Sequence, residues 1–284
     1  MIDFTFVTYA AMPDLDPDDR LAFDLLAQRG FRMQAAVWDD RRVDWSRAGA
    51  CILRSTWDYN LRHEEFLAWT ERVAAVSRMW NSPSLVRWNS NKTDLRDLEA
   101  AGVAIVPTAW IKRGSKADLS ALLGAAGWEL AVIKPSVGLS TYGVRKVSAR
   151  NDADGQSHLE LLLRTHDVMV QPYIASVESH GERALIFIAG QYSHAARKTA
   201  FQQLLPTGEA GEQPVAATPS EISAATRAMA ALPEAPLYAR VDLVHDAAGE
   251  PLVIELELVE PTLFLGMDPQ APARFADALS ALVR

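Results

Sequence analysis

Two apolar segments near the end of the chain carry charged side chains at alternate positions. Arg240 and Asp242 lie in the first segment, and Glu255 and Glu257 lie in the second. Because side chains alternate between the faces of a strand, each pair would share one face, and pairing of the strands would bring three carboxylates and a guanidinium together. Such oxygens suit Mg²⁺, which completes its shell with water and nucleotide phosphates. A solvated strand face would alternate in the same way, but the apolar residues around these acids favour a metal site.

A second segment places a lysine before a loop of small and hydroxyl residues. Lys134 follows an apolar stretch and precedes Ser136, Gly138, Ser140 and Thr141. Backbone N–H groups and hydroxyls of such a loop can surround phosphate oxygens while the lysine supplies a positive charge. The loop lacks the Gly-Lys-Ser/Thr ending of a Walker loop. A simple hairpin connection would use the same residue types, so both interpretations stay open.

A third segment, residues 167–174, is an apolar strand that ends in Gln171, Pro172, Tyr173 and Ile174. Its backbone could pair with the edge of an adenine, although a buried strand that meets a proline would look the same. The six histidines show no metal-ligand spacing, and Cys51 fits a small buried side chain.

The elements that must position these residues fall into two groups. The first part of the chain alternates strands and helices, which predicts an open, largely parallel sheet covered by helices. The expected strands are 3–8, 32–38 and 50–54, and the expected helices run from about 17 to before Gly30 and from 60 to about 79.

The end of the third strand is a candidate contact surface, because ligands bind beyond the carboxyl ends of strands in such sheets. The segment reads Arg54, Ser55, Thr56, Trp57, Asp58. Arg54 could hold a substrate carboxylate through two hydrogen bonds, and Trp57 is expected to pack. A capped turn is the alternative interpretation.

The rest of the chain predicts a mixed and then antiparallel arrangement. The fold class is therefore α/β, with an α+β character in the C-terminal part. Helices are expected at 93–101, 118–126 and 272–283, strands at 106–111, 131–134, 168–171, 183–189, 191–198, 237–245 and 252–258, and a mobile loop at 205–219.

Composition limits the class of protein. The chain has 284 residues, of which 49% are hydrophobic, and its formal net charge is -8. This size allows about two domains, and the negative charge argues against nucleic acid and anionic membranes as partners. One cysteine and the absence of a long apolar run favour a cytoplasmic protein.

The order and spacing of these segments resemble the ATP-grasp superfamily, near the glutathione synthetase and D-alanine:D-alanine ligase branch. The resemblance extends from about Asn89 to Arg284, and the preceding unit suits the small Rossmann-like domain found there. It implies an N-terminal substrate domain at 1–88, a central lid subdomain at 89–170 and a C-terminal catalytic subdomain at 171–284.

The resemblance also implies roles for individual residues, with ATP and Mg²⁺ as cofactors. Nucleotide contacts are expected from Lys92, Lys134, the lid-loop residues Ser136, Gly138, Ser140 and Thr141, the adenine hinge residues Gln171, Tyr173 and Ile174, and a ribose acid at Glu178 or Glu182. The expected metal ligands are Asp242, Glu255 and Glu257, and the expected catalytic cations are Arg240, Lys198, Arg197 and Arg183. Glu257 departs from the family, which commonly has Asn there.

The implied activity is a ligase that converts a small amino-acid carboxylate into an acyl phosphate, which a nitrogen then attacks. Arg54, Ser55, Thr56 and Asp58 would contact the substrate. The motifs at 54–59, 194–198 and 255–261 look most like a branch that includes the D-cycloserine biosynthetic cyclo-ligase, which closes O-ureido-D-serine. Ligation between two molecules, a kinase and a non-catalytic nucleotide-binding module remain alternatives, and related ligases make a homodimer an expectation by analogy.

Overall fold

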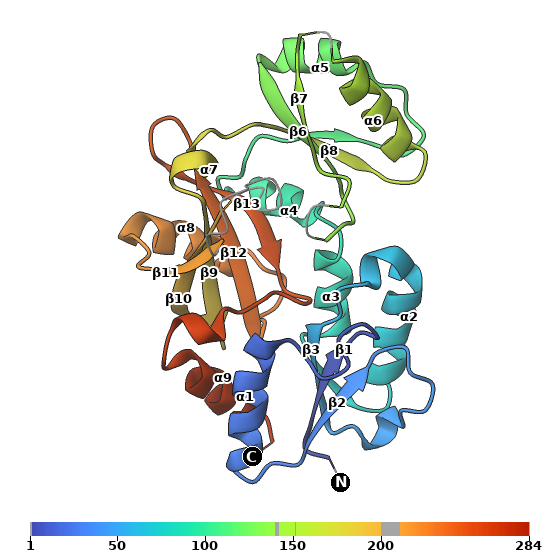
Figure 1. The fold of residues 1–284 in the computed structure, drawn as a ribbon, viewed down its shortest axis with the longest axis vertical. Helices are drawn as coiled ribbons and strands as arrows, with labels where there is room; N and C mark the ends of the chain where they lie inside the picture. Colours follow the sequence, from blue (N-terminus) through green and yellow to red (C-terminus); the bar gives the residue numbers. More distant parts are fainter. Residues whose placement is uncertain (1, 140–141, 151, 200–210, 284) are drawn as a thin grey trace.

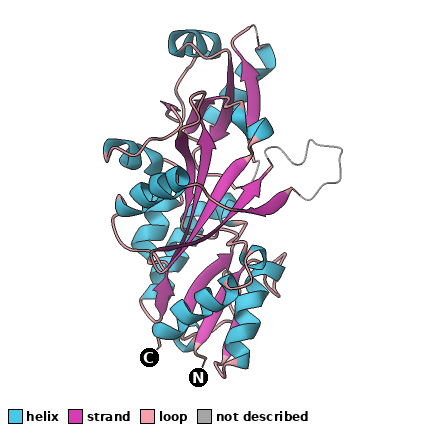
Figure 2. Ribbon diagram, turned by 90° about the vertical axis from the view of Figure 1, so that its left-hand side faces the viewer, coloured by secondary structure: helices cyan, strands magenta, loops and turns pink. Residues whose placement is uncertain are grey.

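The computed structural model describes residues 2–139, 142–150, 152–199 and 211–283. Their strands form three sheets stacked along the long axis of the molecule, with the N-terminal sheet at one end and the central sheet at the other (Figures 1 and 2). The C-terminal sheet lies between them. No helix in these residues is long and apolar enough to cross a bilayer.

The N-terminal sheet is entirely parallel, as the alternation of strands and helices predicts. Its order is β2-β1-β3-β4, and helices α1 and α2 follow its first and third strands. The strands are β1 (Phe4–Thr8), β2 (Met33–Val37), β3 (Ala50–Ser55) and β4 (Arg78–Trp80), and the helices are α1 (Pro17–Gln28) and α2 (His63–Ala74).

The expected helix at 60–79 is shorter than the pattern suggests. A 3₁₀ turn (Tyr59–Arg62) precedes α2, and the chain then turns into β4, which pairs with β3. Ser82 caps a separate helix α3 (Pro83–Asn89), whose first residue is a proline. The sequence analysis missed β4 and α3, because three extended residues between two helices leave little periodic signal.

The central sheet has the order β5-β8-β6-β7 and is antiparallel. Helices α5 and α6 pack on it and share its core. The strands are β5 (Ala109–Ile111), β6 (Leu130–Pro135), β7 (Arg145–Ser148) and β8 (Val168–Pro172), and the helices are α5 (Leu119–Ala126) and α6 (Ala153–Leu163).

Two of the expected domain boundaries need correction. The boundary after residue 170 falls inside β8, and the boundary after residue 88 falls inside α3. Helix α4 (Asp94–Ala100) and the following residues Val103 and Ile105 pack into the core of the C-terminal sheet. The unit that is expected to act as the lid is therefore the central sheet with α5 and α6, which begins after Ile105.

The C-terminal sheet, β11-β10-β9-β12-β13, is antiparallel and is covered on both faces. One face packs on α8 (Pro219–Ala230), and the other packs on α1 and α9 (Ala271–Ala281). The strands are β9 (Glu182–Ile188), β10 (Gln191–Lys198), β11 (Glu212–Val215), β12 (Tyr238–His245) and β13 (Pro251–Glu257). The short helix α7 (Ser176–Ser179) precedes β9, and a 3₁₀ turn (Leu265–Met267) precedes α9. Another 3₁₀ turn, Trp45–Arg47, lies between β2 and β3 of the N-terminal sheet.

Part of the expected mobile loop at 205–219 is ordered secondary structure. Residues 212–215 form the edge strand β11, Pro219 begins α8, and residues 205–210 lie outside the described part. The expected strand at 106–111 is shortened to β5, because Val106 instead donates its N–H to the carbonyl of Val253.

Candidate active site

The antiparallel register of β12 and β13 gathers the alternating charged residues. Arg240 lies opposite Glu257, and Asp242 lies opposite Glu255. Oxygen atoms of Asp242, Glu255 and Glu257 all lie within 4.8 Å of one another. The group is thus compact enough for one cation to reach all three side chains.

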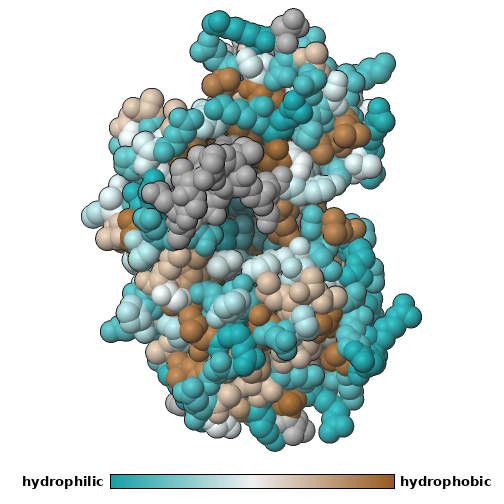
Figure 3. Space-filling view, in the orientation of Figure 1, coloured by the Kyte–Doolittle hydropathy of each residue, from teal (hydrophilic) through white to brown (hydrophobic). Residues whose placement is uncertain are grey.

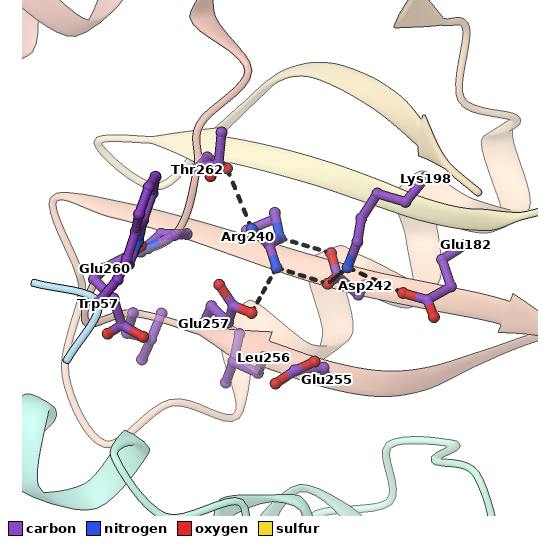
Figure 4. A network of polar contacts seen from close by, with 12 residues as sticks. Trp57, Glu182, Lys198, Arg240, Asp242, Glu255, Leu256, Glu257, Glu260 and Thr262 are labelled. Atoms are coloured by element: carbon purple, nitrogen blue, oxygen red, sulfur yellow. Dashed lines mark hydrogen bonds and ion pairs between the residues drawn. The ribbon is translucent and has the colours of Figure 1, made fainter. Parts of the chain in front are cut away.

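Three cationic side chains are paired with these acids, and Figure 4 shows two of them, Arg240 and Lys198. Arg240 donates from Nε to Asp242 Oδ1 at 2.9 Å and from a terminal nitrogen to Glu257 Oε1 at 2.5 Å. Lys198 Nζ lies 2.7 Å from Asp242 Oδ2 and 3.0 Å from Glu182 Oε2. On the side of the lid, Lys92 Nζ lies 2.9 Å from Glu255 Oε1.

These contacts determine which acids are ionised. Burial acts to raise the pKa of Asp242, but Arg240 and Lys198 more than offset it and hold that pKa below its ordinary value. Burial is likewise offset at Glu255, whose pKa is lowered by Lys92 and Lys134. The pKa of Glu257 is raised instead, because burial and its acidic neighbours outweigh Arg240. Asp242 and Glu255 are therefore ionised at neutral pH.

A cavity lies between the central and the C-terminal sheets and opens toward these acids. Figure 3 shows the surface hollowed in this region. The lining combines apolar side chains with charged ones, as expected for a base and its phosphates. It comprises Lys92, Val132, Lys134, Pro135, Gly138, Tyr142, Val144, Gln171, Pro172, Tyr173, Ile174, Val177, Glu182, Ile254 and Glu255.

Both expected nucleotide lysines reach this cavity. Lys134 is the next-to-last residue of β6, and burial lowers its pKa. Lys92 links the lid loop to the C-terminal sheet, because its Nζ also donates to the carbonyl of Gly138 at 2.7 Å. Ser136 accepts from the backbone N–H of Lys92 and is not part of the lining. Ser140 and Thr141 lie outside the described residues.

The hinge residues Gln171, Tyr173 and Ile174 line the cavity, and the two candidate ribose acids differ. Glu182 belongs to the lining and lies beside Lys198. Glu178 is not part of the lining and accepts from the hydroxyl of Tyr173 at 2.7 Å. The geometry therefore favours Glu182 for the sugar.

Two expected catalytic cations point away from the acids. Arg183 and Arg197 lie opposite each other in the register of β9 and β10, each one residue from the site face. Arg183 Nε lies 3.5 Å from Glu221 of α8, and Arg197 donates to the carbonyl oxygens of Ser179 and His180. The expectation that they hold phosphate or substrate is corrected, because strand alternation sends both to the opposite face.

The expected substrate contact at Arg54 is also corrected. Arg54 is 1% exposed, and its guanidinium donates to Asp19 at 2.8 Å and to the carbonyl of Pro261 at 2.6 Å. Its charge and donors are thus used inside the protein.

The neighbours of Arg54 are similarly placed. Ser55 and Thr56 are fully buried, and the hydroxyl of Ser55 donates to Asp19. Asp58 accepts from the indole N–H of Trp38 at 2.8 Å and pairs with Arg62. The side chains of Ser55 and Asp58 therefore serve contacts within the N-terminal domain.

Sequence reasoning assigned no site role to two other buried polar residues of the C-terminal domain, His194 and Glu260. His194 is buried on the site face of β10, and its Nε2 lies 2.9 Å and 3.0 Å from the carbonyl oxygens of Leu263 and Phe264. Glu260 is a buried acid in the loop after β13. The signal for Glu260 was a third acid shortly after the metal strand, but no partner for it could be read from the sequence.

The fold and the site together define an ATP-grasp ligase, an ATP-dependent enzyme. In fold the chain is similar to the D-alanine–D-alanine ligase of Bacillus anthracis, with a TM-score of 0.70 and 13% identity over 100% of this chain and 97% of the other. It is also similar to the ATP-grasp ligase PsnB in complex with a precursor peptide and AMPPNP, with a TM-score of 0.65 and 18% identity over 100% and 99% of the two chains.

A nearer similarity extends over almost the whole chain. The cycloserine biosynthesis protein DcsG of Streptomyces lavendulae is 36% identical over 293 residues, which cover 96% of each protein. The crystal structure of D-cycloserine synthetase DcsG has a TM-score of 0.90, with 34% identity and 99% of both chains covered. Residues 4–81 match the family model of the N-terminal domain of D-cycloserine synthetase DcsG. The chain belongs to the DcsG family of ATP-grasp ligases.

Proposed function

We propose that this enzyme uses Mg-ATP to activate the carboxylate of O-ureido-D-serine as an acyl phosphate and closes it to D-cycloserine. The observation that carries the proposal is the compact acid group, of which Glu255 lines the cavity, together with whole-chain similarity to a cycloserine biosynthesis protein. The substrate follows from that similarity and from the motifs at 54–59, 194–198 and 255–261.

The donor set fits Mg²⁺. Asp242, Glu255 and Glu257 offer only oxygen ligands, and the lowered pKa values of the first two keep them ionised. Mg²⁺ held by these three residues would supply positive charge that offsets the negative charge of the phosphates during phosphoryl transfer.

The basic residues of the cavity have separate tasks. Lys92 and Lys134 bind phosphate oxygens, and Lys92 exchanges its contact with Glu255 for them when the nucleotide enters. Arg240 and Lys198, anchored on Asp242, stabilise the negative charge that develops on the transferring phosphoryl group and on the oxyanion. Their contacts are already formed, so little reorganisation is needed during the reaction.

Water must be kept from the acyl phosphate. The bond from Lys92 to the carbonyl of Gly138 ties the lid loop to the floor of the cavity. The ureido nitrogen next to oxygen then attacks the acyl carbon, forms the ring C–N bond and expels phosphate. D-cycloserine lacks the carbamoyl group, so one water molecule must remove it from that nitrogen as carbamic acid, which decomposes to CO₂ and ammonia.

The test is phosphate release from Mg-ATP with O-ureido-D-serine alone, and with D- and L-amino acids singly and in pairs. We expect release with O-ureido-D-serine alone and a cyclised product by mass spectrometry. Asp242→Asn should abolish both, whereas Asp154→Asn, a change at an exposed acid of the lid, should not. Release only with a pair of amino acids would make the enzyme an intermolecular ligase, and a phosphorylated product without release would make it a kinase.

A further inference from the structure

Glu260 has a carboxyl group with no partner of its own. The residue is 4% exposed, and its side chain makes no hydrogen bond or ion pair with any residue in the described part of the chain. Among the described residues, Glu260 makes its polar contact through the backbone, where the carbonyl accepts from the indole N–H of Trp57 at 3.0 Å. Buried polar groups nearly always have a partner, so this carboxyl indicates a missing one.

The neighbouring cations are committed elsewhere. Lys92 is bound to Glu255 and to a lid carbonyl, and Arg240 is bound to Asp242 and Glu257. Burial and the charge of Glu257 raise the pKa of Glu260 well above its ordinary value, because no positive charge of the described residues is close enough to offset them. The missing partner is therefore an external group that donates hydrogen bonds, and a positive charge would suit it best.

The position of Glu260 indicates which ligand supplies that group. Figure 4 shows Glu260 and Trp57 at one end of the polar network and Glu182 and Lys198 at the other, with Arg240 between them. Glu182 lines the nucleotide cavity, so the nucleotide occupies that end. The end with Glu260 adjoins the N-terminal domain and is left for the second substrate.

Mg²⁺ is a weaker candidate for the missing partner. The compact group of acid oxygens in the described residues consists of Asp242, Glu255 and Glu257 and does not include Glu260. The backbone at and just after Glu260 is fixed from the N-terminal domain, because Trp57 binds the carbonyl of Glu260 and Arg54 binds that of Pro261. Glu260 is thus held in place outside the compact group of metal acids.

We propose that Glu260 binds the protonated α-amino group of the substrate and so selects amino acids over carboxylates that lack this group. The inference rests on the proposed function for the identity of the substrate. An α-amino nitrogen is bonded to the carbon that bears the carboxylate, so a substrate whose carboxylate faces the phosphoryl group presents its ammonium group a short distance beyond. An ion pair with a buried carboxylate is strong and directional.

The test is calorimetric binding to the full-length enzyme with Mg²⁺ and AMPPNP. The ligands are O-ureido-D-serine and the same molecule without its amino group, 3-(ureidooxy)propanoate. We expect the unmodified enzyme to bind the amino compound at least tenfold more tightly, and Glu260→Gln to remove this preference while its affinity for AMPPNP stays within twofold. Glu212→Gln, a change at an exposed acid of β11, is the control and should keep the preference.

Other outcomes overturn the inference. A preserved preference in Glu260→Gln would do so, and so would an equal loss of affinity for both ligands, which would mean that the residue only maintains the loop. An increased Mg²⁺ requirement would make it a metal ligand instead. If the unmodified enzyme does not bind O-ureido-D-serine, the proposed function fails separately. The preference for an amino group is then measured with D-alanine and propanoate. If the unmodified enzyme shows no preference for D-alanine over propanoate, the role of Glu260 is contradicted.

Discussion

Two adjacent basic residues of β10 illustrate how strongly the face of a strand decides a role. Lys198 contacts Asp242 and Glu182 on the site face, whereas Arg197 contacts backbone carbonyls on the other. We expect Lys198→Met to lower kcat for phosphate release roughly 100-fold, the scale seen when one charge-stabilising donor is removed. Arg197→Gln should change kcat/KM by no more than about twofold. Steady-state phosphate release measures both.

The stability of the two variants provides the control for this prediction. Asp242 keeps both hydrogen bonds from Arg240 in Lys198→Met, so the buried carboxylate stays compensated. Thermal unfolding should then show folded protein at the assay temperature. A loss of activity in Arg197→Gln equal to that in Lys198→Met would contradict the assignment of the two faces.

The charged residues of these strands show what the spacing of residues in the sequence could and could not predict about the site. The alternation of Arg240 with Asp242, and of Glu255 with Glu257, was visible because each pair lies in a single apolar strand. Roles for Arg183, Arg197 and Lys198 depended on the register between strands, which β-bulges shift in both β9–β10 and β12–β13. Register is set by tertiary pairing, so the sequence alone could not assign these faces.

The hairpin of β9 and β10 depends on two glycines in the left-handed region, at its two ends. Gly181 has φ +68, and a Cβ there would lie 2.5 Å from the carbonyl oxygen of Lys198. Gly190 has φ +76 with nothing within 4 Å of such a Cβ. Both substitutions by Ala carry the backbone cost of about 1–2 kcal/mol. Gly181→Ala adds a clash of roughly 1–3 kcal/mol and shifts the strand that holds Lys198.

We therefore expect Gly181→Ala to lose more stability in urea unfolding than Gly190→Ala, and to lose kcat as well. Gly190→Ala serves as the control, because it shares the backbone strain but not the contact. Equal kcat values in the two variants would show that the close approach at Gly181 does not position Lys198.

Among the elements, the strands and helices with strong periodicity were predicted well, and short or locally capped ones were not. The first three strands of the parallel N-terminal sheet and the strands β9, β10, β12 and β13 match their predicted ranges closely. Helix α8 was missed although Thr218 and Glu221 form a capping box at its start. Its apolar face is made largely of alanines, which give little contrast with the polar face.

At the scale of the whole molecule, Arg54 connects the N-terminal domain to the C-terminal sheet. Its guanidinium pairs with Asp19 of α1, donates to the carbonyl of Pro261, and lies over the rings of Tyr238 and Phe275, at 4.8 Å and 5.7 Å. The strand-end arginine that the sequence suggested for substrate recognition thus joins the two bodies between which the substrate is expected to bind. The sequence correctly placed an arginine at the end of a strand. It could not show that this arginine contacts the C-terminal sheet, because the packing of one domain on another is not visible in local sequence.

Arg54→Met tests this assignment. The change leaves Asp19 buried with only the hydroxyl of Ser55 as a side-chain partner, and breaking a buried ion pair in this way costs about 3–5 kcal/mol. Arg62→Met, which removes ion pairs at a side chain 36% exposed, should cost about 1 kcal/mol or less. Urea unfolding gives both values. Arg54→Met/Asp19→Leu should recover part of the loss, because no unpaired charge then remains. An Arg54→Met enzyme of unchanged stability but greatly raised KM for the carboxylate would return Arg54 to the substrate site.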